Sequence, residues 1–232
     1  MSFIIPILIG FIILYTIYGI VKIEHELFEF SILSSIEKIE TENTYGYTNF
    51  ITEKERKILL DFIKKNLSFF NERTNNTELF ATIQTIPNYT KKLIERLRNR
   101  IVKLENIDKY YPDLIHEDAI SVIYDGGYHD YHKDMNYINW ILVRYNIVLS
   151  ESESGGESVY GNEINKWREN TIWKCVAGLV KHGVTLVRGD KPRIVLCLGF
   201  MIHYDEVMKN QHNIRVEEFL ILPEELGYLE QV

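Results

Sequence analysis

Apolar residues recur with helical spacing in two segments of the first half of the chain. The first segment, "ITEKERKILLDFIKKNL", carries Thr52 as a predicted N-cap and Glu55 three positions later, which is the arrangement of a capping box. Its apolar positions are Ile58, Leu59, Phe62 and Ile63. The second segment covers about residues 89–104, and its apolar positions are Ile94, Leu97, Ile101 and Leu104. These patterns predict two helices that each bury one face.

From Glu117 onward the pattern changes to short runs rich in Ile, Val and Tyr, which alternate with polar turns. The runs are "AISVIYDGG", "WILVRYNIVLS", "ESVYG", "WKCVAGLVKHGVTLVRG" and "PRIVLCLGFMIHY". Such runs predict β-strands. Helices followed by strands indicate an α+β fold, either a helix-buttressed β-barrel or a jelly roll.

The N-terminus is apolar all round. Residues 2–21 form a run of twenty residues without a charge, which is long enough to cross a bilayer core of about 30 Å at about 1.5 Å per residue. We therefore predict a transmembrane anchor over residues 1–22, with the membrane as a partner. A cleaved signal peptide is the alternative, but no positive segment precedes the run and no small-residue cleavage site follows it.

The residues after the predicted anchor carry alternating charges and small polar residues, with no sustained strand pattern. We predict a helical or extended stalk over residues 23–46 and a single folded domain over residues 47–232. The charges beside the anchor do not fix its orientation, because Lys22 is followed by Glu24, Glu26 and Glu29. The side of the membrane on which the domain lies therefore stays open.

The charge of the chain bears on the kind of partner. A formal net charge of −7 argues against a general polyanion binder, because affinity for a phosphate backbone needs clustered Lys and Arg. The densest group of cations is Lys92, Arg96, Arg98 and Arg100. These residues alternate with the apolar positions of the second predicted helix, so we expect them on its solvated face. Nucleic acid is therefore not an expected partner.

Candidate chemistry gathers in "YHDYHKDMNYINW", residues 128–140. His132 and Asp134 form an H-x-D pair, a spacing that lets alternate residues of a strand point at one ion. His129 could replace His132, but no carboxylate follows it at this spacing. A third ligand, His182, lies 48 residues beyond Asp134 in another strand-like segment. Two histidines and a carboxylate make the facial triad of non-heme Fe(II) oxygenases, which leaves coordination positions open.

A cation follows the third candidate ligand. Lys191 and Arg193 lie nine and eleven positions after His182, and either could bind a carboxylate of a cosubstrate. Arg193 is preferred because a guanidinium offers a bidentate fork and because Arg193 leads directly into an apolar run. Lys191 remains a close alternative.

Taken in order, these elements resemble the 2-oxoglutarate and Fe(II)-dependent dioxygenases, and within them the prolyl 4-hydroxylase-like branch. That family combines a Tyr, a Gly and H-x-D, then a "GGE-[ST]-x-[FY]" turn, then a His and a basic residue about ten positions later. Here the corresponding segments are "YDGGYHDYHKD", "SGGESVY" at residues 154–160 and "HGVTLVRGDKPR". The resemblance covers about residues 117–200.

The resemblance implies roles for six residues. His132, Asp134 and His182 would be the iron ligands, Arg193 or Lys191 would bind the distal carboxylate of 2-oxoglutarate, and Tyr124 would also touch that cosubstrate. The implied fold is a double-stranded β-helix, a jelly roll flanked by helices. The implied cofactors are Fe(II), 2-oxoglutarate and O₂, with ascorbate as a further candidate.

The resemblance also implies a reaction, the hydroxylation of a side chain, with peptidyl proline as the nominal substrate and a peptide or protein as partner. It favours a lumenal, endoplasmic-reticulum-type location for the catalytic domain. Two alternatives stay open. One is an oxygenase of the same fold that acts on a small molecule, a lipid or nucleic acid, and the other is a non-catalytic, membrane-tethered jelly roll that binds a partner.

Overall fold

A computed structural model describes residues 4–73, 78–82, 88–113, 118–137 and 139–209 of the chain. The chain divides into two compact units, Met1–Ile36 and Glu37–Val232. In the first unit a single helix, α1, runs from Ile4 to Ser35. Within the part of the chain that the structure describes, no helix combines the length and the apolar character needed to cross a bilayer. The structure thus does not support the transmembrane helix predicted over residues 1–22, of which residues 1–3 lie outside the described part.

The second unit begins earlier than the predicted domain boundary at residue 47. Strands β1 (Glu37–Glu40) and β2 (Tyr45–Thr48) form a hairpin that begins inside the segment predicted as a stalk and crosses its predicted end at residue 46. β2 also pairs with β11 (Ile172–Cys175), which joins the hairpin to the main sheet. The sequence "EKIE" of β1 has every side chain exposed, so its strand carries no alternation of apolar and polar residues from which it could be predicted.

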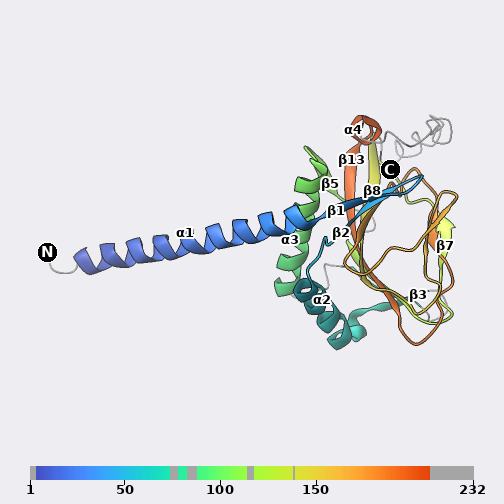
Figure 1. The fold of residues 1–232 in the computed structure, drawn as a ribbon, viewed down its shortest axis with the longest axis horizontal. Coiled ribbons are helices and arrows are strands. Elements are labelled where there is room, and N and C mark those ends of the chain that lie inside the picture. Colours follow the sequence, from blue (N-terminus) through green and yellow to red (C-terminus); the bar gives the residue numbers. More distant parts are fainter. Residues whose placement is uncertain (1–3, 74–77, 83–87, 114–117, 138, 210–232) are drawn as a thin grey trace. The chain divides into compact units, whose positions relative to one another are not determined.

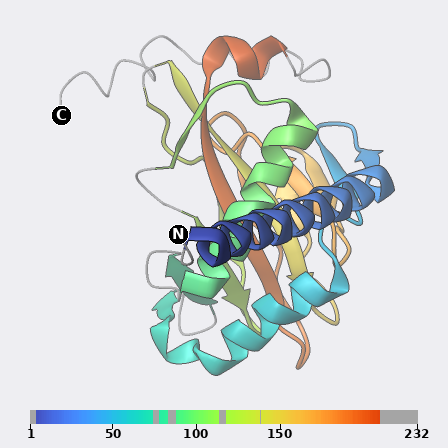
Figure 2. The same ribbon diagram turned by 90° about the vertical axis from the view of Figure 1, so that its left-hand side faces the viewer.

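The two predicted helices are present as α2 (Glu53–Lys65) and α3 (Asn88–Glu105). The capping box is confirmed, because Thr52 Oγ1 accepts a hydrogen bond from the Glu55 backbone N–H at 3.2 Å and Glu55 Oε2 accepts one from the Thr52 N–H at 3.0 Å. The buried apolar residues of α2 are Leu59, Phe62 and Ile63. Figure 2 shows α2 and α3 lying against one face of the large sheet.

The prediction that all four cations of the second helix face solvent is wrong for Arg98, which is 12% exposed and paired with Asp118, and it is furthest from the structure for Arg100. The Arg100 side chain is buried, donates from Nη1 to the Phe50 carbonyl at 2.7 Å and forms an ion pair from Nη2 to Glu55 Oε1 at 3.0 Å. A buried guanidinium requires such partners because transferring an unpaired charge out of water is costly. The partner lies on α2, 45 residues earlier, so the spacing within α3 alone did not reveal it.

This buried ion pair leads to a testable expectation for stability. Burial opposes the charge of Glu55, but the hydrogen bonds that its carboxylate accepts from Arg100 and from the Thr52 backbone N–H outweigh burial and lower the pKa of Glu55. Glu55→Gln leaves Arg100 without its carboxylate and should cost about 3–5 kcal/mol of unfolding free energy at neutral pH. Urea denaturation measures this loss. The control is Lys57→Gln on the exposed face of the same helix, which should change the free energy of unfolding by less than about 0.5 kcal/mol.

The pH dependence follows from the direction of the pKa shift. A lowered carboxyl pKa contributes stability above the ordinary value of about 4, and this contribution disappears as the pH falls through the folded-state pKa. The difference between wild type and Glu55→Gln should therefore shrink in acid. A difference that stays constant with pH would contradict the assigned ion pair.

Among the described residues, two antiparallel sheets make up the β-structure. The larger sheet has nine strands, with the order β1-β2-β11-β8-β13-β6-β4-β3 and with β5 paired to β13. Its remaining strands are β3 (Asn71–Arg73), β4 (Glu78–Thr82), β5 (Tyr110–Pro112), β6 (Ala119–Ile123), β8 (Trp140–Ser150) and β13 (Arg193–His203). The smaller sheet has the order β10-β9-β12-β7. Its strands are β7 (His129–His132), β9 (Ser158–Tyr160), β10 (Glu163–Asn165) and β12 (His182–Val184).

This arrangement is consistent with the predicted jelly roll. β8 and β13 lie side by side at the centre of the larger sheet, and most of their side chains are buried. In Figure 1, β7 lies on the other side of the domain from β8 and β13. The α+β class is thus confirmed, with α2 and α3 outside the larger sheet and the smaller sheet on the opposite side. A 3₁₀ turn (Leu67–Phe69) and a short helix, α4 (Tyr204–Lys209), complete the described elements.

Candidate metal centre

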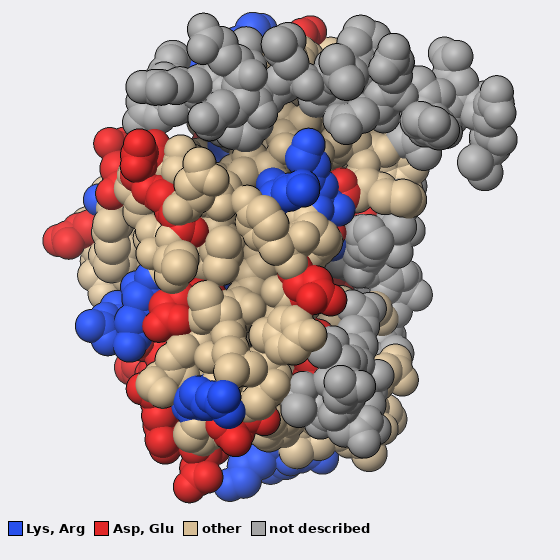
Figure 3. All heavy atoms as spheres, turned by 90° about the vertical axis from the view of Figure 1, so that its right-hand side faces the viewer, with Lys and Arg blue, Asp and Glu red and all other residues tan. Residues whose placement is uncertain are grey.

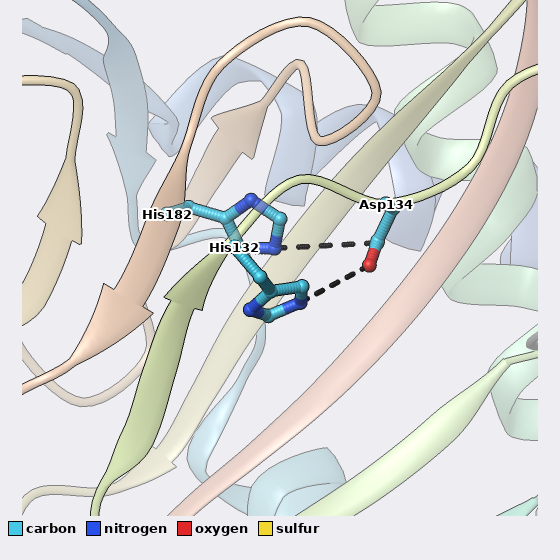
Figure 4. Close-up of side chains that lie close together, drawn as sticks. All are labelled: His132, Asp134 and His182. Carbon is cyan, nitrogen blue, oxygen red and sulfur yellow. Dashed lines mark hydrogen bonds and ion pairs between the residues drawn. The ribbon is translucent and has the colours of Figure 1, made fainter.

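Strand pairing brings the three predicted ligands together. His132 ends β7, His182 begins β12, and the two residues are directly opposite each other in the antiparallel pairing of these strands. Their ring centroids are 4.5 Å apart. Asp134 follows β7, and its backbone N–H donates to the carbonyl of Ala177 at 2.9 Å. Figure 4 shows both imidazoles and the carboxylate turned toward one another.

The ligand atoms of these side chains lie within the reach of one ion. His132 Nε2 is 3.2 Å from Asp134 Oδ1, and His182 Nε2 is 4.0 Å from Asp134 Oδ2. One candidate ligand atom from each residue lies within 4.8 Å of the others. The spatial cluster therefore matches the set proposed from the sequence.

Backbone contacts fix the tautomer of both histidines. His132 Nδ1 lies 2.7 Å from the carbonyl of Asp130, and His182 Nδ1 lies 3.1 Å from the carbonyl of Val180. A carbonyl oxygen can only accept, so each Nδ1 carries a hydrogen and donates it. In the neutral ring Nε2 then holds the lone pair, and in both residues Nε2 is the atom that faces Asp134. Such a hydrogen bond behind the ring is typical of metal-bound histidine.

The charges at the centre suit a divalent cation. Burial lowers the pKa of His182 to about 4, so this ring is neutral at physiological pH. Burial opposes the charge of Asp134, but the hydrogen bond with His132 and the charge of Arg144 outweigh it and hold the pKa of this carboxyl well below its usual range. The hydrogen bond with Asp134 raises the pKa of His132. Two imidazole nitrogens and one carboxylate are a donor set that fits Fe(II).

A cavity of about 320 Å³ adjoins these three side chains. Alternate residues of the central strands line it, because successive side chains of a strand point to opposite faces. The lining residues from β13 are Arg193, Val195 and Cys197, and those from β6 are Ser121 and Ile123. The two strands pair with Arg193 opposite Ile123 and Val195 opposite Ser121. The cavity thus lies between the inner face of the larger sheet and the histidines of the smaller one.

Of the three residues predicted to touch the cosubstrate, Arg193 is the one that lines this cavity. Its side chain is buried, and Nη2 donates to Ser158 Oγ at 3.1 Å. Burial lowers the pKa of Arg193 to about 10, so the guanidinium remains charged at neutral pH. Lys191 is exposed and forms an ion pair with Glu169 at 2.7 Å. Tyr124 is half-buried beyond the end of β6, and neither it nor Lys191 is among the lining residues.

The "SGGESVY" segment makes room for Arg193. Gly155 and Gly156 both have positive φ angles, +66° and +68°, a conformation that favours glycine. A Cβ on Gly156 would approach Ser152 Oγ to 2.5 Å and Arg193 Cδ to 3.2 Å. The turn then leads into β9, whose first residue, Ser158, accepts the Arg193 hydrogen bond. The two glycines therefore allow the turn to pack closely beside the buried guanidinium.

Two charged residues of the cavity wall, the half-buried Arg144 and the buried Glu78, were not predicted. Arg144 of β8 donates from Nε to Asp134 Oδ2 at 2.6 Å, and Glu78 of β4 accepts from Ser121 Oγ at 2.8 Å. Glu78 Oε2 also lies 3.4 Å from Nδ1 of His129, which gives that histidine a place at the cavity wall. Arg144 had a sequence signal, a single cation inside the apolar run "WILVRYNIVLS". Nothing in the sequence around Glu78 indicated its burial.

The chain is similar to solved structures in its fold, whereas no family model and no curated protein matches its sequence. Among solved structures, a viral collagen prolyl hydroxylase from Paramecium Bursaria Chlorella virus-1, in complex with 2-oxoglutarate, is similar with a TM-score of 0.50 and 16% identity, over 72% of this chain and 95% of that one.

A second similar structure is a prolyl hydroxylase from Trichoplax adhaerens in complex with a peptide of the oxygen degradation domain of hypoxia inducible factor. Its TM-score is 0.52 and its identity 13%, over 80% of this chain and 94% of that one. At these identities the likeness is one of fold. The chain therefore has the fold of 2-oxoglutarate-dependent prolyl hydroxylases, as the resemblance of its motifs predicted.

Proposed function

We propose that this protein is a 2-oxoglutarate- and Fe(II)-dependent dioxygenase that hydroxylates a side chain, with proline in a peptide as the nominal substrate. The observation that carries the proposal is the convergence of the His132–Asp134–His182 cluster and the buried Arg193 on one cavity. Within this proposal the larger and smaller sheets are the two sheets of a double-stranded β-helix. The similarity in fold to prolyl hydroxylases supports the same conclusion.

Each part of the cavity has a task in this reaction. His132 and His182 would hold Fe(II) through Nε2, and Asp134 would hold it through its carboxylate. The bound iron would supply the oxidising chemistry that uses O₂ to convert 2-oxoglutarate to succinate and CO₂, with one oxygen atom going to succinate and the other to the substrate. Arg193 would bind the distal carboxylate of 2-oxoglutarate by charge-assisted hydrogen bonds. Lys191 and Tyr124 lie outside the cavity wall, so Arg193 is the proposed partner of that carboxylate.

The apolar part of the wall supports cosubstrate binding as well. Ile123, Val184 and Val195 line the cavity beside Arg193. Apolar side chains exclude water, and the interaction between a guanidinium and a carboxylate strengthens when water is excluded. The buried hydroxyl of Ser158 holds Arg193 by the hydrogen bond from Nη2. The cation is thus oriented before the cosubstrate arrives.

The charge distribution favours a peptide over nucleic acid as substrate. Figure 3 shows the face of the domain that carries β7, and on its described residues Lys and Arg side chains are interspersed with Asp and Glu and with uncharged side chains. A nucleic-acid site would instead gather cations into a patch or stripe. The similar prolyl hydroxylase from Trichoplax adhaerens is bound to a peptide. We therefore take a peptide as the first substrate class to test.

The test is a panel of peptides incubated with purified protein, Fe(II), 2-oxoglutarate and ascorbate. Each proline-containing peptide is paired with a control in which alanine replaces the proline. We expect a proline peptide to gain one oxygen atom by mass spectrometry, with an equal amount of succinate, and its alanine control to gain none. Oxygen gain at a residue other than proline would overturn the proposed substrate, and the absence of succinate with every peptide would overturn the proposed reaction.

A further inference from the structure

Arg144 lies at the centre of the larger sheet, beside the proposed iron ligands. It belongs to β8, opposite Cys175 of β11 on one side and Gly199 of β13 on the other. Its side chain is 11% exposed and lines the cavity. A charged side chain at this depth requires partners, because its desolvation is otherwise uncompensated.

Two carboxylates hold the guanidinium of Arg144. Nε donates to Asp134 Oδ2 at 2.6 Å, and Nη2 donates to Asp113 Oδ2 at 3.0 Å. The Asp113 side chain is 1% exposed. A Cβ at position 199 would lie 2.6 Å from Asp113 Cβ, so Gly199 provides the space in which Asp113 approaches the sheet. Asp113 thus fixes the orientation of Arg144, and Arg144 fixes the orientation of Asp134.

The summed charge of Asp113, Arg144 and Asp134 explains the presence of Asp113. A lone guanidinium next to Asp134 would cancel the charge of that carboxylate and repel a divalent cation. Asp113, Arg144 and Asp134 together carry a formal charge of −1, the same as Asp134 alone. Arg144 can therefore hold Asp134 through a hydrogen bond without removing the attraction of the site for a cation.

The two oxygens of Asp134 have different neighbours. Oδ2 accepts the short hydrogen bond from Arg144 Nε and lies 4.0 Å from His182 Nε2, whereas Oδ1 is 3.2 Å from His132 Nε2. We propose that Arg144, anchored by Asp113, is a positioning residue that engages Oδ2 and leaves Oδ1 to the metal. A carboxylate held in this way would offer the metal one oxygen, which would leave coordination positions for the cosubstrate. This inference rests on the proposed function and adds a residue outside the ligand set.

A direct role of Arg144 in binding 2-oxoglutarate is less compatible with its contacts. Two of its nitrogens already donate to carboxylates, Asp134 and Asp113. Arg193 Nη2 donates to the neutral hydroxyl of Ser158, so a cosubstrate carboxylate at Arg193 would replace a contact to a hydroxyl, whereas at Arg144 it would replace contacts to carboxylates. The two arginines that line the cavity therefore have separate roles, Arg144 toward the metal ligand and Arg193 toward the cosubstrate.

The experiment uses the full-length protein loaded with Co(II) or Mn(II), so that turnover does not enter the measurement. The visible absorption spectrum of bound Co(II) reports its coordination, and titration of the Mn(II)-loaded protein with 2-oxoglutarate gives the cosubstrate affinity. Arg144→Gln should change the Co(II) spectrum and weaken 2-oxoglutarate binding by roughly 10- to 100-fold, the range typical for loss of a partner of a metal ligand. Arg144→Lys keeps the charge but not the planar guanidinium, so its Co(II) spectrum and its 2-oxoglutarate affinity should lie between those of wild type and Arg144→Gln.

Two further variants separate positioning from charge and from general stability. Asp113→Asn keeps an acceptor for Arg144 but removes one negative charge, so it should weaken Mn(II) binding and leave the Co(II) spectrum close to wild type. Arg56→Gln is the matched control, because Arg56 is also partly buried and paired with Glu169 but does not line the cavity. It should leave both the spectrum and the cosubstrate affinity unchanged.

The outcomes distinguish this inference from the proposed function. Wild-type protein that binds neither Mn(II) nor Co(II) would overturn the proposed function itself. Wild-type protein that binds metal and 2-oxoglutarate, with Arg144→Gln and Arg144→Lys indistinguishable from it in spectrum and affinity, would overturn the positioning role alone. If Arg144→Gln fails to fold, as judged by circular dichroism, the Arg144→Lys measurement decides.

Discussion

Replacing His182 with alanine is expected to abolish the Fe(II)-dependent conversion of 2-oxoglutarate to succinate. His182 supplies one of three nitrogen or oxygen donors, and its Nε2 is aimed at the shared site by the hydrogen bond from Nδ1 to the Val180 carbonyl. Loss of a partner behind a metal ligand already costs about 10- to 100-fold, so loss of the ligand itself should exceed a hundredfold. Succinate formation in purified, iron-supplemented protein measures the effect.

The matched control for this variant is His203→Ala. His203 is the last residue of β13, as His182 is the first of β12, but the side chain of His203 is 42% exposed and its partner is Asp205 on the surface. It should retain wild-type turnover, and it should bind Mn(II) as wild type does, whereas His182→Ala should not. Undiminished succinate release by His182→Ala would contradict the proposed iron site.

The second large effect is expected at Arg193. Arg193→Gln should raise the KM for 2-oxoglutarate by roughly 10- to 100-fold, because a hydrogen bond to a charged group contributes about 1.5–3 kcal/mol. The maximal rate at saturating cosubstrate should fall less than the affinity, since the contact is made in the ground state as well as during reaction. Steady-state kinetics with varied 2-oxoglutarate measures both quantities.

Lys191→Gln is the control for Arg193→Gln. The sequence offered both cations, but Lys191 is exposed and paired with Glu169 outside the cavity. Its replacement should leave the KM for 2-oxoglutarate within about twofold of wild type, in line with the small effects of surface charges. A large rise in KM for Lys191→Gln together with a normal value for Arg193→Gln would reverse the assignment.

The sequence predicted those parts of the fold and site that depend on local spacing. The capping box at Thr52 and Glu55 is a local signal, and the structure contains it. The H-x-D spacing placed His132 and Asp134 together because they are neighbours along one segment. His182 was found through the order of the motifs, and the pairing of β7 with β12 places it opposite His132.

The features that the sequence did not reveal depend on contacts between distant segments. Arg144 meets Asp113 across 31 positions, and Arg100 meets Glu55 across 45. Neither spacing corresponds to a helical or strand period, so no local pattern marks these pairs. The choice between Lys191 and Arg193 likewise required burial, because both lie on the same side of an extended strand in sequence alone.

In the proposed reaction the cavity binds iron and 2-oxoglutarate together and couples them to oxidation of a peptide. The most direct measurement is succinate formation from 2-oxoglutarate by wild-type protein, with Fe(II) either supplied or removed by a chelator, and with a proline-containing peptide present. We expect succinate that depends on Fe(II), that matches the oxygen gained by the peptide and that disappears in Asp134→Ala. Succinate formation that persists in the chelated protein or in Asp134→Ala would contradict the proposed reaction.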